Sequence, residues 1–182
     1  RRQRQMCIRD RKAYRDYDIS AVIDKDAYGE YKGKGFYYRT QRADDKGQFE
    51  PFAWDENDVG KTPLKYFQKI VEFCKKNNIE LTCVTTTITP KAALDGVSEE
   101  TGRWFANLCS QNGVRYIDFN LVSLDELERT DDDFADWEGH MMGWMAEKYS
   151  EVLAKVIRGD NIRFYKDYQE YRMAYESRKG IK

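Results

Sequence analysis

The sequence predicts an α/β fold in which a parallel β-sheet is covered by helices on both faces. Two observations support this prediction. Between residues 62 and 157, three segments carry apolar residues at helical spacing, and two runs rich in β-branched residues separate them. The connections between these segments are short, and alternating helices and strands with short connections are typical of parallel sheets.

The first predicted unit is a helix followed by a strand. The helix, residues 62–76, begins with a threonine at the N-cap and Pro63 at the first helical position, where both residue types are favoured. The strand, residues 79–86, is rich in β-branched residues and is expected to be buried. Thr89-Pro90 is expected to close this strand.

A second unit repeats this order. Its helix is expected to begin at Ser98 and to end at Asn112-Gly113, because glycine is common just past a helix end. Residues 114–119 follow as the next strand. After an acidic loop, a long helix is expected over residues 141–157, with its apolar side chains on one stripe.

The residues before the first predicted unit have a weaker pattern. Residues 19–23 are compatible with a short strand, and glycines interrupt the aromatic stretch at residues 28–38. Residues 43–60 are polar and rich in turn formers, so they are expected to form a loop.

The first eleven residues are strongly basic, with five arginines and one aspartate. They resemble peptides mistranslated from sequencing-adapter DNA, so residues 1–11 are interpreted as a non-native leader. A nucleic-acid-binding arm is the alternative. This segment carries a charge of +4, and the formal net charge of the whole chain is −1. The residues after position 11 therefore carry a net charge of about −5, and they lack the basic stripe that binds phosphate backbones. No nucleic-acid partner is predicted, and no apolar run approaches the ~20 residues of a membrane helix.

The sequence indicates no metal site. The cysteines at positions 74, 83 and 109 lack the spacing of zinc ligands and are expected to be buried, reduced thiols. The acidic residues within 131–138 lack the alternating spacing of a calcium loop. Solvated carboxylates ahead of a helix are the simpler interpretation of that cluster.

His140 is the only histidine in the chain, and Asp136 precedes it by four residues. A lone imidazole beside a carboxylate is the arrangement that hydrolases use for a general base. The predicted strands end at residues 85–87 and at Asn120, and ligands of parallel sheets bind at this edge. The loop with Asp136 and His140 leaves the same edge. His140 is therefore a candidate base with Asp136 as its partner, and a solvated loop histidine is the alternative.

Three blocks of the sequence resemble parts of one known family. Residues 66–81 and 84–86 are similar to its penultimate helix and strand, and residues 116–120 to its last strand. Residues 134–154 resemble its final Asp-x-x-His block and closing helix. The family is that of the bacterial SGNH hydrolases, the GDSL-like esterase superfamily, and the resemblance covers about residues 60–157.

The resemblance implies a flavodoxin-like, three-layer α/β/α sandwich with a five-stranded parallel sheet. It also implies that a serine attacks an ester carbonyl, that His140 is the catalytic base and that Asp136 orients it. A glycine and an asparagine from two middle blocks complete the family's oxyanion hole. No metal or organic cofactor is implied.

The sequence departs from the family pattern at three points. Three residues separate Asp136 from His140, where the family usually has two, and Gly139 is the extra residue. Met142 stands where the family often has asparagine. The glycine-flanked serine block is absent, because none of six serines considered has that context. These are Ser20, Ser98, Ser110, Ser123, Ser150 and Ser177.

The missing serine block predicts a chain truncated at its N-terminus. Residues 12–160 are interpreted as the C-terminal part of an SGNH-like domain, and residues 161–182 as an aromatic C-terminal extension. In that extension, tyrosines and a phenylalanine recur at helical spacing, which predicts either a helix packed on the domain or a docking or sugar-stacking surface. The 182 residues alone are expected to be inactive and prone to self-association, because a truncated sheet has an uncovered edge.

Three functions are compatible with this sequence. The first is a serine-type esterase that acts on a small-molecule ester or an acylated carbohydrate. The second is a related O-acyltransferase, in which a sugar hydroxyl replaces water. The third is a non-catalytic interaction domain of the same fold. The base chemistry is shared by the two enzymes, so the sequence does not separate them.

Overall fold

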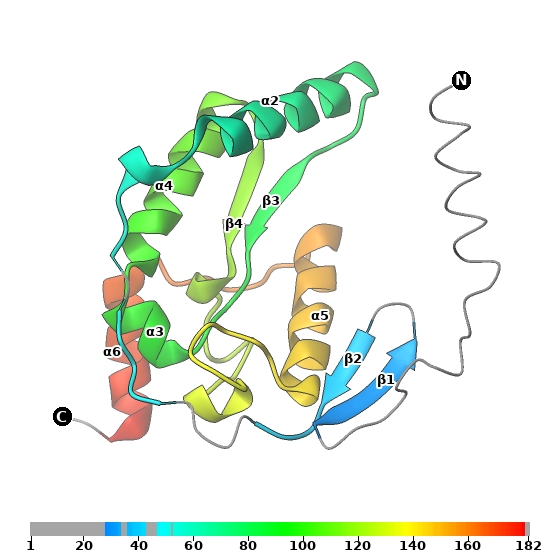
Figure 1. Cartoon of the computed structure of the whole chain (residues 1–182). Coiled ribbons are helices and arrows are strands. Elements are labelled where there is room, and N and C mark those ends of the chain that lie inside the picture. Colours follow the sequence, from blue (N-terminus) through cyan, green and yellow to red (C-terminus); the bar gives the residue numbers. More distant parts are fainter. Residues whose placement is uncertain (1–27, 34–35, 43–46, 52, 181–182) are drawn as a thin grey trace.

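The computed structural model describes residues 28–33, 36–42, 47–51 and 53–180 (Figure 1). The predicted leader at 1–11 and the possible strand at 19–23 lie outside these residues. The described part is an α/β structure, as predicted, with two small sheets of two strands each, one antiparallel and one parallel.

The central part follows the predicted order of elements. Helix α2 (Lys61–Lys76) precedes strand β3 (Thr82–Thr85), and helix α4 (Ser98–Gln111) leads to strand β4 (Arg115–Asp118). Helix α5 (Gly143–Arg158) comes after an irregular segment. Strands β3 and β4 pair in parallel, with Thr82 opposite Arg115 and Thr85 opposite Asp118.

Both faces of this parallel pair are covered by helices. One face contributes Val84 and Ile117 to a core shared with α5. The other face contributes Cys83 and Tyr116 to a core shared with α2 and α4. Alternate residues of a strand point to opposite faces, which explains this division. Figure 1 accordingly shows α4 and α5 on opposite sides of β3 and β4. The parallel sheet has two strands in the described residues, and the five-stranded sandwich is not seen there.

The predicted boundaries need correction at the first unit. Helix α2 begins at Lys61 with Gly60 as its N-cap, so the threonine expected in that role lies inside the helix. Thr89-Pro90 starts a helix that was not predicted, α3 (Pro90–Asp95), because the Thr89 hydroxyl accepts a hydrogen bond from the amide of Ala92 at 3.3 Å. Thr89-Pro90 therefore marks the start of a helix and not the end of a strand.

The aromatic stretch near the start of the described residues forms a hairpin that the sequence pattern did not indicate. Strands β1 (Gly29–Gly33) and β2 (Phe36–Arg39) pair antiparallel. The hairpin packs on the start of α5, where a Cβ on Gly143 would collide with the ring of Tyr38. The predicted loop after it also contains a short 3-10 helix, η2 (Glu56–Asp58).

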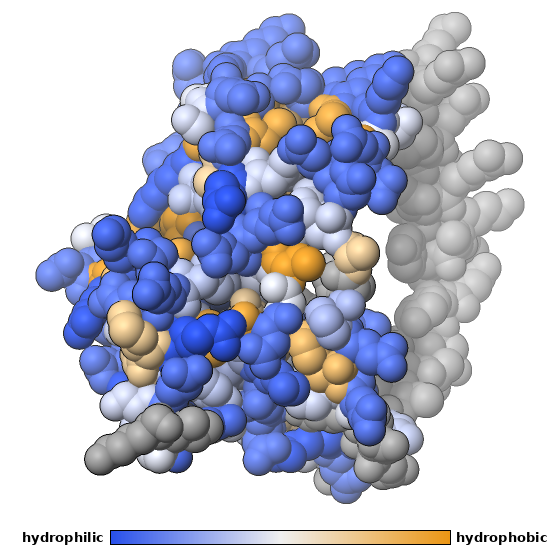
Figure 2. All heavy atoms as spheres, turned by 90° about the vertical axis from the view of Figure 1, so that its left-hand side faces the viewer, coloured by the Kyte–Doolittle hydropathy of each residue, from blue (hydrophilic) through white to orange (hydrophobic). Residues whose placement is uncertain are grey.

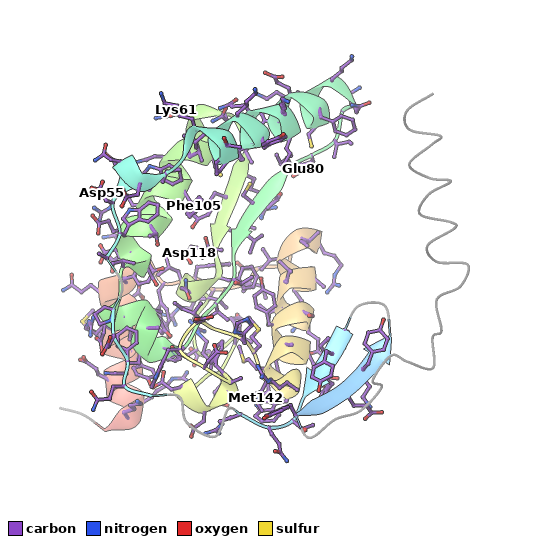
Figure 3. The ribbon with its side chains drawn as sticks, in the orientation of Figure 1. Asp55, Lys61, Glu80, Phe105, Asp118 and Met142 are labelled. Atoms are coloured by element: carbon purple, nitrogen blue, oxygen red, sulfur yellow. The ribbon has the colours of Figure 1, made fainter. Side chains whose placement is uncertain are left out.

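The C-terminal segment is packed on the domain. Helix α6 (Tyr168–Lys179) buries Tyr168 and Tyr171, and the ring of Tyr171 stacks on that of Tyr165 at 5.6 Å. The hydroxyl of Tyr168 donates to Asp118 Oδ2 at 2.8 Å, at the carboxyl end of β4 in the interior of the molecule (Figure 3). Of the two interpretations of this segment, packing holds for these tyrosines, which are too buried to stack on a sugar.

Arg129 holds the irregular segment that follows β4, which starts with the 3-10 helix η3 (Phe119–Leu121). Its side chain is buried, with 2% exposed, and its guanidinium donates to three backbone carbonyls. These are the carbonyls of Val122 at 3.1 Å, Leu127 at 2.9 Å and Asn120 at 2.7 Å. The guanidinium also lies 4.8 Å from the centre of the Tyr171 ring, so one buried cation joins the segment to α6.

None of the helices described here is both long enough and apolar enough to cross a membrane.

Candidate active site

Asp136 and His140 lie on a closed hairpin loop that leads into α5. Phe134 and Met141 form an isolated antiparallel bridge, and the amide of Ala135 donates to the carbonyl of His140 at 2.8 Å. Phe134 and Ala135 are fully buried, so the base of the loop is anchored in the core. The bridge between Phe134 and Met141 therefore holds the residues from Asp136 to His140 in a fixed turn.

The structure brings the two predicted site residues into direct contact. His140 Nδ1 lies 2.7 Å from Asp136 Oδ2. The other carboxylate oxygen, Oδ1, accepts from the amides of Gly139 at 3.1 Å and His140 at 3.2 Å. The His140 side chain is 64% exposed, and its Nε2 has no partner among the described residues. The ring is thus held at one nitrogen and open at the other.

The environment of Asp136 favours its ionised form. Partial burial by itself would raise the pKa of this carboxyl. The hydrogen bonds from the amide and the ring of His140, the charge of that ring, and the amide of Gly139 outweigh burial, so the pKa of Asp136 lies below its usual value. An ionised Asp136 is a strong acceptor for an N–H at Nδ1 of His140.

Position 139 of the loop requires glycine. Gly139 has a φ of +96°, which side-chain-bearing residues rarely adopt. A Cβ at this position would lie 2.5 Å from Cγ2 of Ile88. Glycine therefore permits both the turn and the close approach to Ile88, and the loop accommodates three residues between Asp136 and His140.

Replacing Gly139 with alanine is expected to separate Asp136 from His140. The left-handed backbone costs about 1–2 kcal/mol for alanine, and the collision with Ile88 adds about 1–3 kcal/mol, so the loop should rearrange. NMR chemical shifts of the single histidine ring would report the lost contact. The double variant with Ile88→Ala should recover part of the stability lost, because it removes the nearest colliding atom. An unchanged ring spectrum in Gly139→Ala would contradict this account of the loop.

The carboxyl ends of both parallel strands meet the loop, as the sequence predicted. The amide of Ile88, just past β3, donates to Oδ1 of Asn120, just past β4, at 3.0 Å. Asn120 is 1% exposed, and its backbone amide donates to Asp118 Oδ1 at 3.0 Å. Because Ile88 in turn packs under Gly139, Asn120 supports the loop from below.

Asp118 is partly buried behind this contact. Its burial raises its pKa above the usual value, although hydrogen bonds from Tyr168 and Asn120 and the charge of Arg129 act in the opposite direction. The backbone amide of Asn120, two residues further along the chain, supplies one hydrogen bond to Asp118. The partnership with Tyr168 was not foreseeable, since 50 residues separate the two.

A cavity of about 430 Å³ lies beside the loop. Its lining includes Trp137 and Glu138 from the loop, Thr85 and Asn120 from the strand ends, and Ser98 from the start of α4. Such a size is within the range of ligand sites, about 300–1,000 Å³. The indole of Trp137 donates to the carbonyl of Gly47 at 3.1 Å, so this residue both anchors the loop and lines the cavity.

The acidic cluster ahead of α5 serves caps and ion pairs. Asp133 accepts from the Thr130 amide at 2.8 Å and completes a capping box around the 3-10 helix η4 (Asp131–Asp133). It also accepts from the indole of Trp144 at 2.7 Å. Asp132 pairs with Arg42 at 2.6 Å. Within the described residues, no group of three or more His, Cys, Asp and Glu side chains is placed to hold a metal ion.

Comparisons with known proteins add no assignment to this geometry. No protein-family model, no curated protein and no solved structure matches the chain.

Proposed function

We propose that this chain carries the base-bearing part of a serine-type ester hydrolase site. The observation that supports the proposal most is the 2.7 Å contact between His140 Nδ1 and Asp136 Oδ2, with Nε2 open to a substrate. A histidine held in this way by an ionised carboxylate acts as a general base through its second nitrogen.

The reaction follows from these positions. A serine hydroxyl attacks the ester carbonyl and transfers its proton to Nε2 of His140, and Asp136 stabilises the imidazolium that results. The imidazolium then protonates the departing alcohol, which leaves an acyl-enzyme. Water hydrolyses this intermediate with His140 again as base. The serine is not assigned within the 182 residues, so the proposal requires it from other polypeptide.

The finer fold is proposed together with the function. The order α2, β3, α4, β4, α5 and the helices on both faces of the strand pair support an SGNH-like arrangement. In this proposal, residues 12–160 are the C-terminal part of a flavodoxin-like three-layer sandwich whose remaining strands extend the parallel sheet. The substrate is a small ester or an acylated carbohydrate.

An O-acyltransferase is the second candidate, because it needs the same base and differs only in the acceptor of the acyl group. A non-catalytic domain of this fold would not need Nε2 to stay open. The exposed ring of His140 and the cavity beside Trp137 therefore favour an enzyme over that third possibility.

The tautomer of His140 tests the proposal in this chain directly. The sequence contains one histidine, so its ring signals in a long-range ¹H–¹⁵N NMR spectrum need no assignment. With the ring neutral, we expect the proton on Nδ1, because Asp136 accepts it, and a lone pair on Nε2. Asp136→Asn should remove this preference, because the carboxamide is a weaker acceptor.

A matched control lies in the acidic cluster. Asp132→Asn removes a carboxylate that is 74% exposed and pairs with Arg42, and it should leave the tautomer unchanged. A proton on Nε2 in the unmodified chain would refute the proposed role of His140 as a base.

A further inference from the structure

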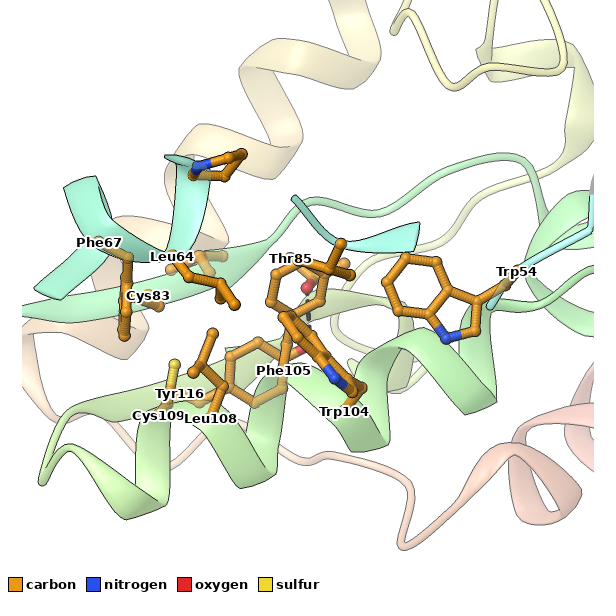
Figure 4. Close-up of a pocket in the computed structure, with 13 residues that line it drawn as sticks. Trp54, Leu64, Phe67, Cys83, Thr85, Trp104, Phe105, Leu108, Cys109 and Tyr116 are labelled. Carbon is orange, nitrogen blue, oxygen red and sulfur yellow. Dashed lines mark hydrogen bonds between the residues drawn. The ribbon is translucent and has the colours of Figure 1, made fainter. Parts of the chain in front are cut away.

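A pocket of about 470 Å³ lies at the surface between η2 and α4. Its walls include the indole rings of Trp54 and Trp104, whose centres are 5.7 Å apart and whose planes meet at 71°. Figure 4 shows Trp54 coming from the segment before α2 and Trp104 from α4. The two rings form two walls of a corner, and we call this site the tryptophan pocket.

The tryptophan pocket is negatively charged. Three carboxylates line it, those of Asp55, Glu56 and Glu100, against the single guanidinium of Arg103. Arg103 is already paired at 3.0 Å with Glu99, which is not part of the lining. Glu56 and Glu100 form no ion pair with any of the described residues. An uncompensated negative charge therefore lies beside two indole rings.

The surroundings of the tryptophan pocket are polar. Figure 2 views the side of the molecule that carries η2 and α4, where hydrophilic side chains predominate. Asp55 is labelled in Figure 3, and its Oδ1 accepts from the backbone amide of Asn57 at 2.8 Å and from the side-chain amide at 2.7 Å. At least one carboxylate of the lining is thus held in place, and the polar walls favour a charged ligand over an apolar one.

We propose that the tryptophan pocket binds a free quaternary ammonium compound of the choline class. The face of an aromatic ring attracts cations, and tryptophan does so most strongly. A trimethylammonium group is compact and nearly spherical, so it contacts both of two rings that meet at 71°. A sugar ring is flat and stacks on only one of two such rings. The carboxylates add an attraction that a neutral ligand does not gain.

The charge of the pocket also selects among quaternary ammonium compounds. Choline carries a single positive charge, whereas phosphocholine carries a phosphate next to the same head group. The carboxylates of the pocket repel that phosphate, so free choline fits better. The tryptophan pocket shares no lining residue with the cavity beside the hairpin loop. The inference therefore goes beyond the proposed hydrolase function and does not depend on it.

The indole signals in a ¹H–¹⁵N NMR spectrum measure binding to the unmodified chain. The sequence contains four tryptophans, so four indole N–H signals are expected. Titration with choline chloride should shift the signals of Trp54 and Trp104 saturably. The signals of Trp137 and Trp144, whose N–H groups donate to acceptors within the protein, should not move. Ring currents should move the trimethyl signal of choline upfield, and sodium chloride at the same concentrations should do neither.

A neutral ligand of the same shape tests the role of the charge. In 3,3-dimethyl-1-butanol a carbon atom replaces the nitrogen of choline, and this alcohol should bind roughly tenfold more weakly or worse. Phosphocholine should bind roughly threefold more weakly. Absent indole shifts, equal binding of the neutral alcohol, tighter binding of phosphocholine, or the same shifts with glucose would overturn the inference.

Two carboxylates of η2 provide a matched pair of substitutions. Glu56 lines the tryptophan pocket, and Asp58 on the same 3-10 helix does not. Glu56→Gln should weaken choline binding roughly threefold, and Asp58→Asn should change it by less than about 1.5-fold. Arg103→Gln removes a positive charge and should strengthen binding roughly twofold. All three side chains are exposed, so the fold should be preserved. Equal effects of the two carboxylate variants would contradict the placement of the cation.

The rings are tested by a substitution that keeps the site apolar. Trp54→Leu should weaken choline binding roughly tenfold, and it also assigns the missing indole signal. If this variant does not fold, the charge variants of η2 and α4 still decide the inference. His140→Ala should bind choline as the parent does, so a wrong histidine tautomer would refute the hydrolase proposal and leave the tryptophan pocket standing.

Discussion

Replacing His140 with alanine is expected to lower ester turnover by a factor of about 10³–10⁴ or more. The measurement uses the natural gene, including any coding sequence upstream, and a small chromogenic ester. The loss is large because alanine cannot accept the serine proton at the position of Nε2. Asp136→Asn should also reduce turnover strongly, because it leaves the ring in place but removes the acceptor that orients it.

The control is an exposed carboxylate on the helix that follows the loop. Glu147→Gln in α5 touches neither the loop nor the cavity and should leave turnover within about twofold. Labelling by a serine-directed phosphonate should persist in Glu147→Gln and slow greatly in His140→Ala. Undiminished turnover in the alanine variant would exclude the role assigned to His140.

Replacing Arg129 with alanine is expected to lower the free energy of unfolding by about 3–5 kcal/mol. The substitution leaves the carbonyls of Val122, Leu127 and Asn120 without their donor in the interior. It also removes the cation from the face of Tyr171 and leaves a cavity. Urea denaturation followed by circular dichroism gives the value, and a loss of this size would leave a domain of ordinary stability close to unfolding.

Arg163→Ala is the matched control for this substitution. Arg163 belongs to the segment before α6, its side chain is 61% exposed, and its ion pairs with Asp125 and Glu170 are at the surface. Exposed ion pairs contribute about 0–1 kcal/mol, so this variant should unfold nearly as the parent does. If Arg129→Ala were no more destabilising than Arg163→Ala, the hydrogen bonds of Arg129 would not stabilise the segment after β4 as proposed.

The central elements were predictable because their signals are local. Apolar residues at helical spacing located α2, α4 and α5 to within a few residues, and β-branched runs located β3 and β4. The strands are shorter than predicted, because a strand ends where its partner ends, and the pairing covers Thr82 to Thr85 only. Helix α3 was missed because Thr-Pro was interpreted as the end of the preceding strand.

The hairpin β1–β2 had no clear pattern in the sequence. Its strands are short, glycines interrupt them, and its position depends on the contact between Tyr38 and the start of α5. No spacing rule predicts a contact between residues more than 100 positions apart. The same reason applies to Arg129, whose partners include a ring in α6 that the local sequence does not reveal.

The contact between Asp136 and His140 was predictable from the sequence, and its surroundings were not. Asp136 and His140 are close in sequence, so a single turn can join them, and their contact follows from that short separation. The cavity at Trp137 and the support from Asn120 through Ile88 depend on strand ends that the fold brings to the loop.

The sequence by itself determined the order of helices and parallel strands and the pairing of one carboxylate with one imidazole, because periodicity and short spacing act within a few residues. The tertiary structure alone decided that Tyr168 and Tyr171 are buried, that Arg129 joins the segment after β4 to α6, and that Gly139 must lie against Ile88. These outcomes depend on which distant surfaces pack together, and close packing is a property of the folded interior that no local pattern encodes.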